Sequence, residues 1–191
     1  MYVILSHMRY ISVSDSLIRV LDEVRSVLQD FNASISVDER EAIAEITLHE
    51  NTTNELSLRE FITAVNAGYP VSEASQLLYI HDKTLFEIDV QTNTRNQNEC
   101  ERQIGRIIGK NGSIKEKIEK STQTDLIISD SVVYILGTFR NCSEARDVVY
   151  SILEGMPITQ ACKHLKRYED VSQVIDEPTP DTRSQHKEMF D

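Results

Sequence analysis

A cluster of glycines in the middle of the chain has the spacing of an anion-binding loop. Gly109 and Gly112 stand three residues apart and enclose Lys110 and Asn111. Glycine has no Cβ atom, so two of them let the backbone turn tightly and approach another backbone closely. An apolar helical pattern follows from Ser113, and the first amides of a helix favour phosphate oxygens. The pattern therefore indicates a loop that can hold a phosphate backbone.

Two better-known glycine loops are excluded by the spacing. Gly105 and Gly109 are too close together for a Walker A loop, and Asn111 stands where Ser or Thr would bind magnesium. The Gly-x-Gly turn of a dinucleotide fold is also missing. A Gly-x-x-Gly pair alone is common in unrelated turns. A helix on each side, a following β-hairpin and nearby basic residues make the signal more specific.

The charge distribution agrees with an anionic ligand at this loop. Residues 102–120 have a net charge of +4, whereas the whole chain has a net charge of -11. The net charge is -7 for residues 1–80, +1 for residues 81–168 and -5 for residues 169–191. An anion would be attracted to the basic segment and repelled elsewhere. Charge alone also fits a solvated helix with i,i+4 ion pairs.

The chain contains an internal repeat with an offset of 87 residues. Gly68-Tyr69-Pro70 aligns with Gly155-Met156-Pro157, and in each copy an apolar helical pattern runs into the glycine. Upstream, each copy has two β-rich runs joined by a polar turn. The copies also share an opening strand and a helical region. The predicted strands are 8–13, 34–37 and 43–48, then 85–90, 125–128 and 132–136; helices are predicted at 14–29 and 113–121.

This order predicts an α+β fold in which each half has a three-stranded sheet with helices on one face. We expect a first domain at residues 1–80, a second at 81–168 and an acidic, flexible tail at 169–191. The first half has no glycine where the loop would fall, and its acidic residues include Asp22 and Glu23. We therefore expect it to serve packing or protein contact.

Other function classes find little support in the residues. No apolar run approaches the roughly 18–20 residues of a membrane span, and the start lacks the basic region of a signal peptide. The 3 cysteines form no CxxC pair and have no histidine at ligand spacing, which suits a reducing cytosol and predicts no metal. No Ser/His/Asp set or paired carboxylates stand out. We expect a soluble intracellular protein that is not an enzyme and needs no cofactor.

Residues 104–112, Ile-Gly-Arg-Ile-Ile-Gly-Lys-Asn-Gly, resemble the signature of the KH domain. That resemblance implies a GxxG loop that clamps about four nucleotides of single-stranded RNA. Over roughly residues 5–168, including 68–70, 134–137 and 153–157, the chain is similar to the tandem-KH ribosome-assembly family called Dim or partner-of-Nob, in its archaeal-like branch. The fold it implies is two tandem type I KH-like domains, of which the first is degenerate and lacks GxxG.

The family resemblance also implies a function. Members bind the single-stranded 3′ region of small-subunit ribosomal RNA and aid its 3′-end maturation. The implied partners are that rRNA, a Nob-type endonuclease and the alpha subunit of initiation factor two, and the implied location is cytoplasmic, or nucleolar and cytoplasmic in a eukaryote. Two alternatives remain open: a protein scaffold for the nuclease or initiation factor, and a generic KH regulator of messenger RNA.

The predicted RNA site consists of the loop and its flanks. Lys110 and Asn111 lie at the loop tip, where their side chains can face phosphates. The flanking basic residues are expected to line the same groove, and isoleucines are expected to form an apolar floor for bases, although packing in the core is an alternative for them. The predicted RNA-binding residues are Arg106, Ile107, Ile108, Gly109, Lys110, Asn111, Gly112, Lys115 and Lys117.

Overall fold

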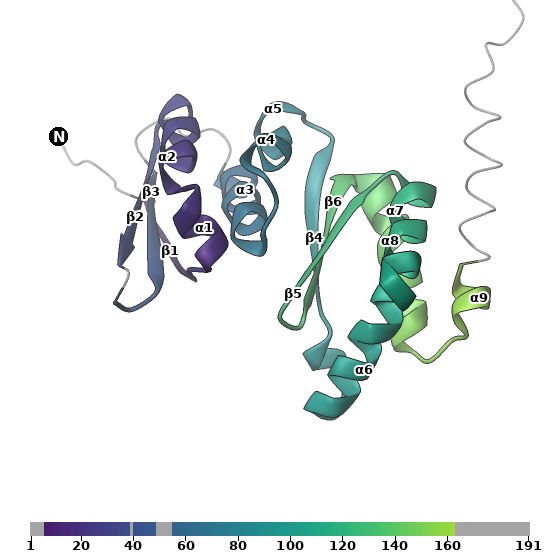
Figure 1. The fold of residues 1–191 in the computed structure, drawn as a ribbon. Helices are drawn as coiled ribbons and strands as arrows, with labels where there is room; N and C mark the ends of the chain where they lie inside the picture. Colours follow the sequence, from purple (N-terminus) through teal and green to yellow (C-terminus); the bar gives the residue numbers. More distant parts are fainter. Residues whose placement is uncertain (1–5, 39, 49–54, 163–191) are drawn as a thin grey trace, which may run out of the picture.

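The two halves of the chain fold with the same order of elements. A computed structural model describes residues 6–38, 40–48 and 55–162, so the predicted tail lies outside the described residues. Each half runs strand, helix, helix, strand, strand, helix, and then turns at its Gly-x-Pro corner into a short helix (Figure 1). The α+β class predicted from the sequence is confirmed.

The elements have the following bounds. The first half contains β1 (Ser6–Ser12), α1 (Asp15–Arg19), α2 (Leu21–Asp30), β2 (Ala33–Asp38), β3 (Ile43–Leu48), α3 (Glu55–Ala67), α4 (Val71–Ala74) and α5 (Gln76–Tyr79). The second contains β4 (Lys83–Asp89), η1 (Gln91–Asn93), α6 (Gln97–Ile108), η2 (Lys110–Gly112), α7 (Ser113–Thr122), β5 (Asp125–Ser129), β6 (Val132–Thr138), α8 (Phe139–Leu153) and α9 (Ile158–Ala161).

Each half forms a three-stranded antiparallel sheet with the last strand in the centre. The first sheet has the order β1-β3-β2 and the second has the order β4-β6-β5. The register pairs Ile35 with Ile46 in the first sheet and Leu126 with Ile135 in the second. All four of these side chains are buried, as expected where apolar residues of neighbouring strands share the core face.

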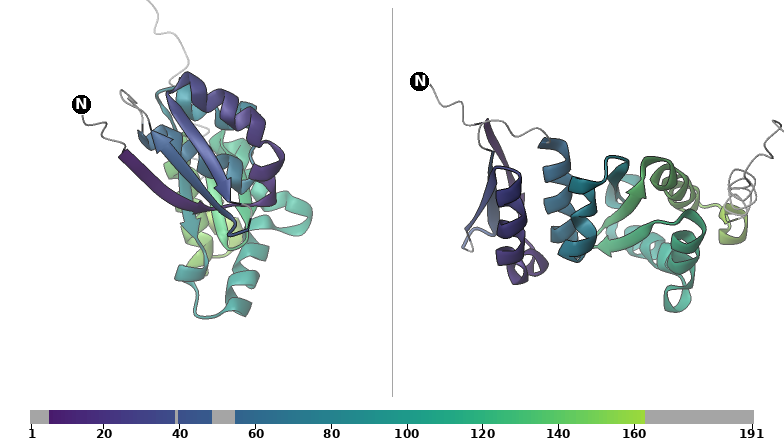
Figure 2. Two further views of the ribbon diagram at one scale, coloured as in Figure 1. Left: turned by 90° about the vertical axis from the view of Figure 1, so that its left-hand side faces the viewer. Right: turned by 90° about the horizontal axis from the view of Figure 1, so that it is seen from above.

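The second sheet is buried on both faces: its own helices cover one face, as predicted, and the first half covers the other. Val133 and Ile135 of β6 belong to the core formed with α6, α7 and α8. Leu136 of β6 and Leu85 of β4 instead belong to the core of the first half. Seen from above, the layers follow one another as first sheet, α1 to α3, second sheet and the helices of the second half (Figure 2).

Tyr69, in the first Gly-x-Pro corner, joins the two halves. Its side chain is 3% exposed, and its hydroxyl donates toward two backbone carbonyls of the second sheet, 2.7 Å from that of Asp125 and 3.1 Å from that of Tyr134. Burial raises the pKa of this hydroxyl, so it stays a donor at every physiological pH. The corner thereby fixes β5 and β6 to the first half.

The helical region predicted as continuous over 14–29 is interrupted. Val20 leaves helical geometry, with φ -114° and ψ 15°, and separates α1 from α2. Ser14 caps α1 by accepting from the Leu17 amide and donates to the Asn66 carbonyl, 2.6 Å away. This interruption falls where the second half carries its glycine loop, but it takes a single residue and no glycine.

Replacing Tyr69 with Phe should lower the free energy of unfolding by about 1 kcal/mol, because a hydrogen bond to buried carbonyls is lost while the ring stays packed. Urea denaturation followed by circular dichroism measures the change. Tyr150→Phe is the matched control, since Tyr150 is 36% exposed and lies on α8. Equal stabilities for wild type and Tyr69→Phe would contradict the role given to the hydroxyl.

Candidate nucleic-acid interface

The glycine loop connects α6 to α7 through a run of left-handed residues. Gly109 has φ 72° and ψ 177°, and its amide donates to the Gly105 carbonyl at 2.9 Å, which closes the last turn of α6. Asn111 and Gly112 then have φ of 54° and 79°. Gly112 precedes α7 and has no side chain with which to cap the first amides of that helix. Those amides suit an external acceptor such as phosphate.

The two glycines of the loop are required for different reasons. A Cβ atom on Gly109 would collide with the side chain of Ile114 and lie 2.9 Å from the Ile114 backbone nitrogen. A Cβ atom on Gly112 would meet nothing within 4 Å, so only its positive φ favours glycine. Gly109 therefore permits close packing of the loop on α7, whereas Gly112 leaves open space beside the loop.

Lys110 and Asn111 are exposed at the tip of the loop. Within the described part of the chain, neither side chain has a hydrogen-bond or ion-pair partner. Asn111 tolerates the left-handed conformation better than most residues. The tip thus offers one unpaired cation and one amide side chain to solvent.

Ion pairs within helices neutralise half of the basic residues around the loop. Lys115 lies 2.8 Å from Glu119, Lys120 lies 2.7 Å from Glu116, and Arg102 lies 3.4 Å from Glu99. The alternative of a solvated, ion-paired helix face therefore describes these three. Glu119 also accepts from the amide of Leu126 at 2.8 Å, which ties α7 to β5.

Lys117 remains without an ion-pair partner among the described residues. It is exposed on α7 and lies close enough to Cys162 to influence that thiol electrostatically. Together with Lys110, it is a cation of the basic segment that is free to meet an anion.

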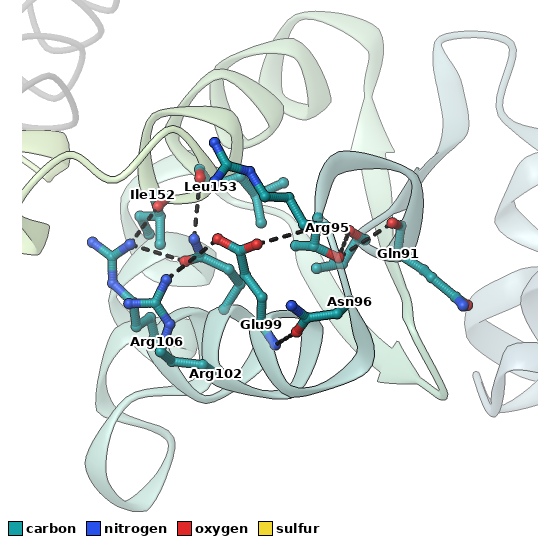
Figure 3. Close-up of polar contacts among 11 residues, drawn as sticks. Gln91, Arg95, Asn96, Glu99, Arg102, Arg106, Ile152 and Leu153 are labelled. Carbon is teal, nitrogen blue, oxygen red and sulfur yellow. Dashed lines mark hydrogen bonds and ion pairs between the residues drawn. The ribbon is translucent and has the colours of Figure 1, made fainter.

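Arg106, predicted to line the RNA groove, is bonded within the domain to the end of α8. Its guanidinium donates to the Ile152 carbonyl at 2.7 Å (Figure 3). The Met156 carbonyl accepts from the same guanidinium at 2.6 Å. It also donates to the side-chain oxygen of Gln103, whose amide nitrogen donates to the Leu153 carbonyl. Arg106 thus joins α6 to the end of α8, where unpaired carbonyls and the helix dipole favour a cation.

Ile107, predicted as part of an apolar floor for bases, is fully buried in the core of the second half. Its side chain is therefore not part of the surface. Ile108 is partly exposed beside the loop, and Ile128 of β5 is partly buried against the same core. Of the three isoleucines expected to form the floor, these two have accessible surface.

The start of α6 is held by a cap that the sequence analysis did not single out. The side chain of Asn96 accepts from the Glu99 amide at 2.9 Å, and Glu99 in turn accepts from the Arg95 amide at 3.1 Å. The arrangement differs from a capping box in that Glu99 reaches the amide of Arg95, one residue before the cap, and Asn three residues before Glu was its sequence signal. No group of three metal-ligating side chains that could hold an ion occurs among the described residues.

Comparison with known families identifies the second half. Residues 84–170 match the model of the second KH domain of PNO1 proteins, described as a eukaryotic-type (type I) KH domain. The second half is thus similar to a PNO1-type KH domain. The β4-α6-α7-β5-β6-α8 order and the GxxG loop at 109–112 are the features of the KH domain that the match contains.

Curated relatives are pre-rRNA-processing PNO1 proteins of fungi. The Debaryomyces hansenii protein is 34% identical over 117 residues, which cover 59% of this chain and 46% of that protein. The Candida albicans protein is 40% identical over 101 residues, covering 51% of this chain and 36% of that protein. The chain thus spans about half the length, or less, of these relatives.

Solved structures share the fold of both halves. A protein of unknown function from Aeropyrum pernix has a TM-score of 0.76 at 24% identity and covers 90% of this chain and 95% of its own. Dim2p from Pyrococcus horikoshii has a TM-score of 0.70 at 20% identity, covering 83% and 98%. A chain of the a/eIF2alpha–aDim2p–rRNA complex from the same organism has a TM-score of 0.72 at 20% identity. The match covers 87% of this chain and 96% of that chain.

No helix among residues 6–38, 40–48 and 55–162 is long and apolar enough to cross a membrane.

Gly109→Ala should destabilise the KH domain by roughly 3 kcal/mol, because the cost of the strained backbone and the cost of the collision with Ile114 add together. Gly112→Ala should cost only about 1 kcal/mol, from its left-handed backbone alone. Chemical denaturation of both variants measures the difference. Equal losses would contradict the close approach of Gly109 to α7.

Arg106→Met should lower the free energy of unfolding by about 2 kcal/mol, because the carbonyls of Ile152 and Met156 lose a charged donor. The RNA affinity of the folded variant should change by no more than about twofold, with the same salt dependence. Fluorescence anisotropy over a salt series tests this. A weaker dependence of RNA affinity on salt, with unchanged stability, would show that Arg106 contacts RNA.

Proposed function

We propose that this protein is an RNA-binding assembly factor of the small ribosomal subunit. In this proposal its KH domain holds the single-stranded 3′ region of small-subunit rRNA while that end matures. The observation that carries the proposal is a PNO1-type KH domain whose GxxG loop presents an unpaired Lys110 at its tip. The pre-rRNA-processing relatives support the same role.

The proposed contacts divide between backbone and bases. Phosphates approach the loop and the uncapped start of α7, where amide dipoles and Lys110 favour negative charge. Asn111 donates or accepts at the loop tip, and Lys117 extends the positive surface along α7. Bases lie over Ile108 and Ile128, which are both partly exposed apolar residues of this domain.

Lys115 belongs to the proposed site, but unlike Lys110 it is not a free cation. Its ammonium is paired with Glu119, and part-exposed ion pairs of this kind contribute little to stability. A phosphate can therefore share the lysine with Glu119 at small cost. Gly109 and Gly112 shape the site, and Ile107 and Arg106 support it from within the fold.

The first half is proposed to be a degenerate type I KH-like domain spanning residues 1–80, followed by the KH domain at 81–168. Its sheet order and element order match those of the second half, but Val20 replaces the glycine loop. Because this half carries -7 by sequence, we assign it to packing and protein contact rather than to RNA. An acidic tail at 169–191 completes the proposed division.

A scaffold function is the second candidate. The fold is shared with aDim2p in a complex that contains a/eIF2alpha and rRNA, which supports a partner of the initiation-factor-two alpha type beside RNA. A Nob-type endonuclease is proposed from the family resemblance. No chemical step is assigned to the protein itself, and the proposed location follows the ribosome-biogenesis relatives, in the nucleolus or cytoplasm.

The double substitution Lys110→Asp and Asn111→Asp tests the clamp in the full chain. It places two carboxylates against the phosphate backbone and leaves both glycines intact. RNA affinity should fall by roughly 2–4 kcal/mol, from the lost lysine contact and the added repulsion. The thermal melt should barely move, because exposed loop substitutions usually change stability by less than about 0.5 kcal/mol.

Lys120→Asp is the matched control, since Lys120 is an exposed lysine of α7 that is already paired with Glu116. It should weaken binding far less than the loop variant does. Affinity is measured with a single-stranded oligonucleotide of the rRNA 3′ region and with an unrelated one of equal length. If the loop variant folds and binds RNA like wild type, the GxxG segment is only a turn and the proposal is rejected.

A further inference from the structure

A cleft of about 660 Å³ lies where the two halves meet, away from the glycine loop. It is lined by the first turn of α3, the start of β4 and the first turn of α8, and none of its lining residues belongs to the loop or to α7. These three segments begin at the same end of the molecule (Figure 1). Ligand sites occur preferentially at such junctions.

Two large apolar side chains in this cleft are exposed to solvent. Leu56 of α3 is 65% exposed and Phe139 of α8 is 66% exposed, and both line the cleft. The rings of Phe139 and Phe86 form a T-shaped pair with centroids 5.5 Å apart, and the guanidinium of Arg146 lies 5.5 Å from the centroid of the Phe86 ring. Phe139 is thus held in place while most of its surface contributes nothing to the core.

Glu60 supplies a carboxylate at the same cleft. It accepts from the Thr84 hydroxyl at 3.0 Å, and burial raises the pKa of its carboxyl group. No cation lies within ion-pair distance of it among residues 6–38, 40–48 and 55–162. A partly desolvated carboxylate with only neutral donors gains strongly from a cation that arrives from outside.

The charges around the cleft favour a polypeptide over a nucleic acid. Asp82 adds a second carboxylate to the lining, and Arg140 is already paired with Glu144 at 3.3 Å. A phosphate would therefore be repelled by Glu60 and Asp82, and among the lining residues His81 and Lys83 are the basic side chains not engaged in an ion pair. A cationic peptide would be attracted by the same two carboxylates.

We infer that this cleft docks a protein segment in which an aliphatic or aromatic side chain stands close to a lysine or arginine. The apolar side chain packs between Leu56 and Phe139, and the cation bonds to Glu60. An aromatic anchor beside a buried, paired charge is the usual composition of an interaction hot spot. This protein-binding site is separate from the proposed RNA site and does not depend on it.

The test uses the full-length chain as bait for a phage-displayed library of random peptides about twelve residues long. Wild type should enrich peptides with an apolar residue near Lys or Arg. A synthetic peptide of the consensus should bind roughly tenfold more weakly to Phe139→Ser and to Glu60→Gln. Library selection on Glu60→Gln should keep the apolar preference and lose the basic one.

Tyr150→Ser is the matched control, because Tyr150 is an exposed aromatic of α8 outside the cleft. It should leave peptide binding unchanged, and all variants should bind RNA like wild type. If Phe139→Ser does not fold, Leu56→Ser replaces it at the opposite wall.

Three results would overturn the inference. They are a selection that enriches no basic–apolar peptide, binding that survives both cleft substitutions, and protection of Leu56 and Phe139 by single-stranded RNA. Occupation of the cleft by a synthetic peptide of residues 183–191 would assign it to the chain's own terminal segment and would likewise reject a separate partner.

Discussion

Burial of the second sheet on both faces is the constraint on which the rest of the molecule depends. The helices of the first half cover the face that its own helices leave open, and the hydroxyl of Tyr69 reaches the backbone of two of its strands. The position of β5 is fixed from one side by Tyr69 and from the other by Glu119 of α7. The first half therefore supports the sheet of the second half through direct packing and hydrogen bonds.

The two Gly-x-Pro corners show how one repeated unit acquired two tasks. In the first corner, the side chain of Tyr69 points away from its own half and donates a hydrogen bond to the backbone of the second sheet. In the second, the carbonyl of Met156 accepts from Arg106 and the corner is tied back to its own domain. The positions on α8 that correspond to Ala64 and Ala67 of α3 are Ser151 and Glu154. Small apolar residues pack on a sheet, whereas a glutamate there favours solvent, so this face is unsuited to receiving a third sheet.

The KH domain separates the residues that hold its loop from those that face outward. Gln103, Arg106 and Ile107 lie on the inner side of α6 and bond or pack within the domain. Lys110 and Asn111 lie one turn later, beyond the end of the helix, where no protein group competes for them within the described chain. Because helical ion pairs engage Arg102, Lys115 and Lys120, the cations left without an acidic or carbonyl partner in this segment of the described chain are Lys110 at the loop tip and Lys117 on α7.

Local patterns by themselves determined much of this protein. The strand at 43–48 was predicted with its observed bounds, and the loop at 109–112 was located from glycine spacing, because backbone freedom is a property of single residues. Tertiary structure decided which side chains the loop region exposes. Ile107 and Ile108 are chemically identical neighbours, and only packing separates the buried one from the accessible one. Arg106 has carbonyl partners about 50 residues away, which no local spacing encodes. The unbroken apolar run at 132–136 was a sign that both faces of β6 are buried, but the element that covers the second face lies some 65 residues earlier, and only the folded chain brings it there.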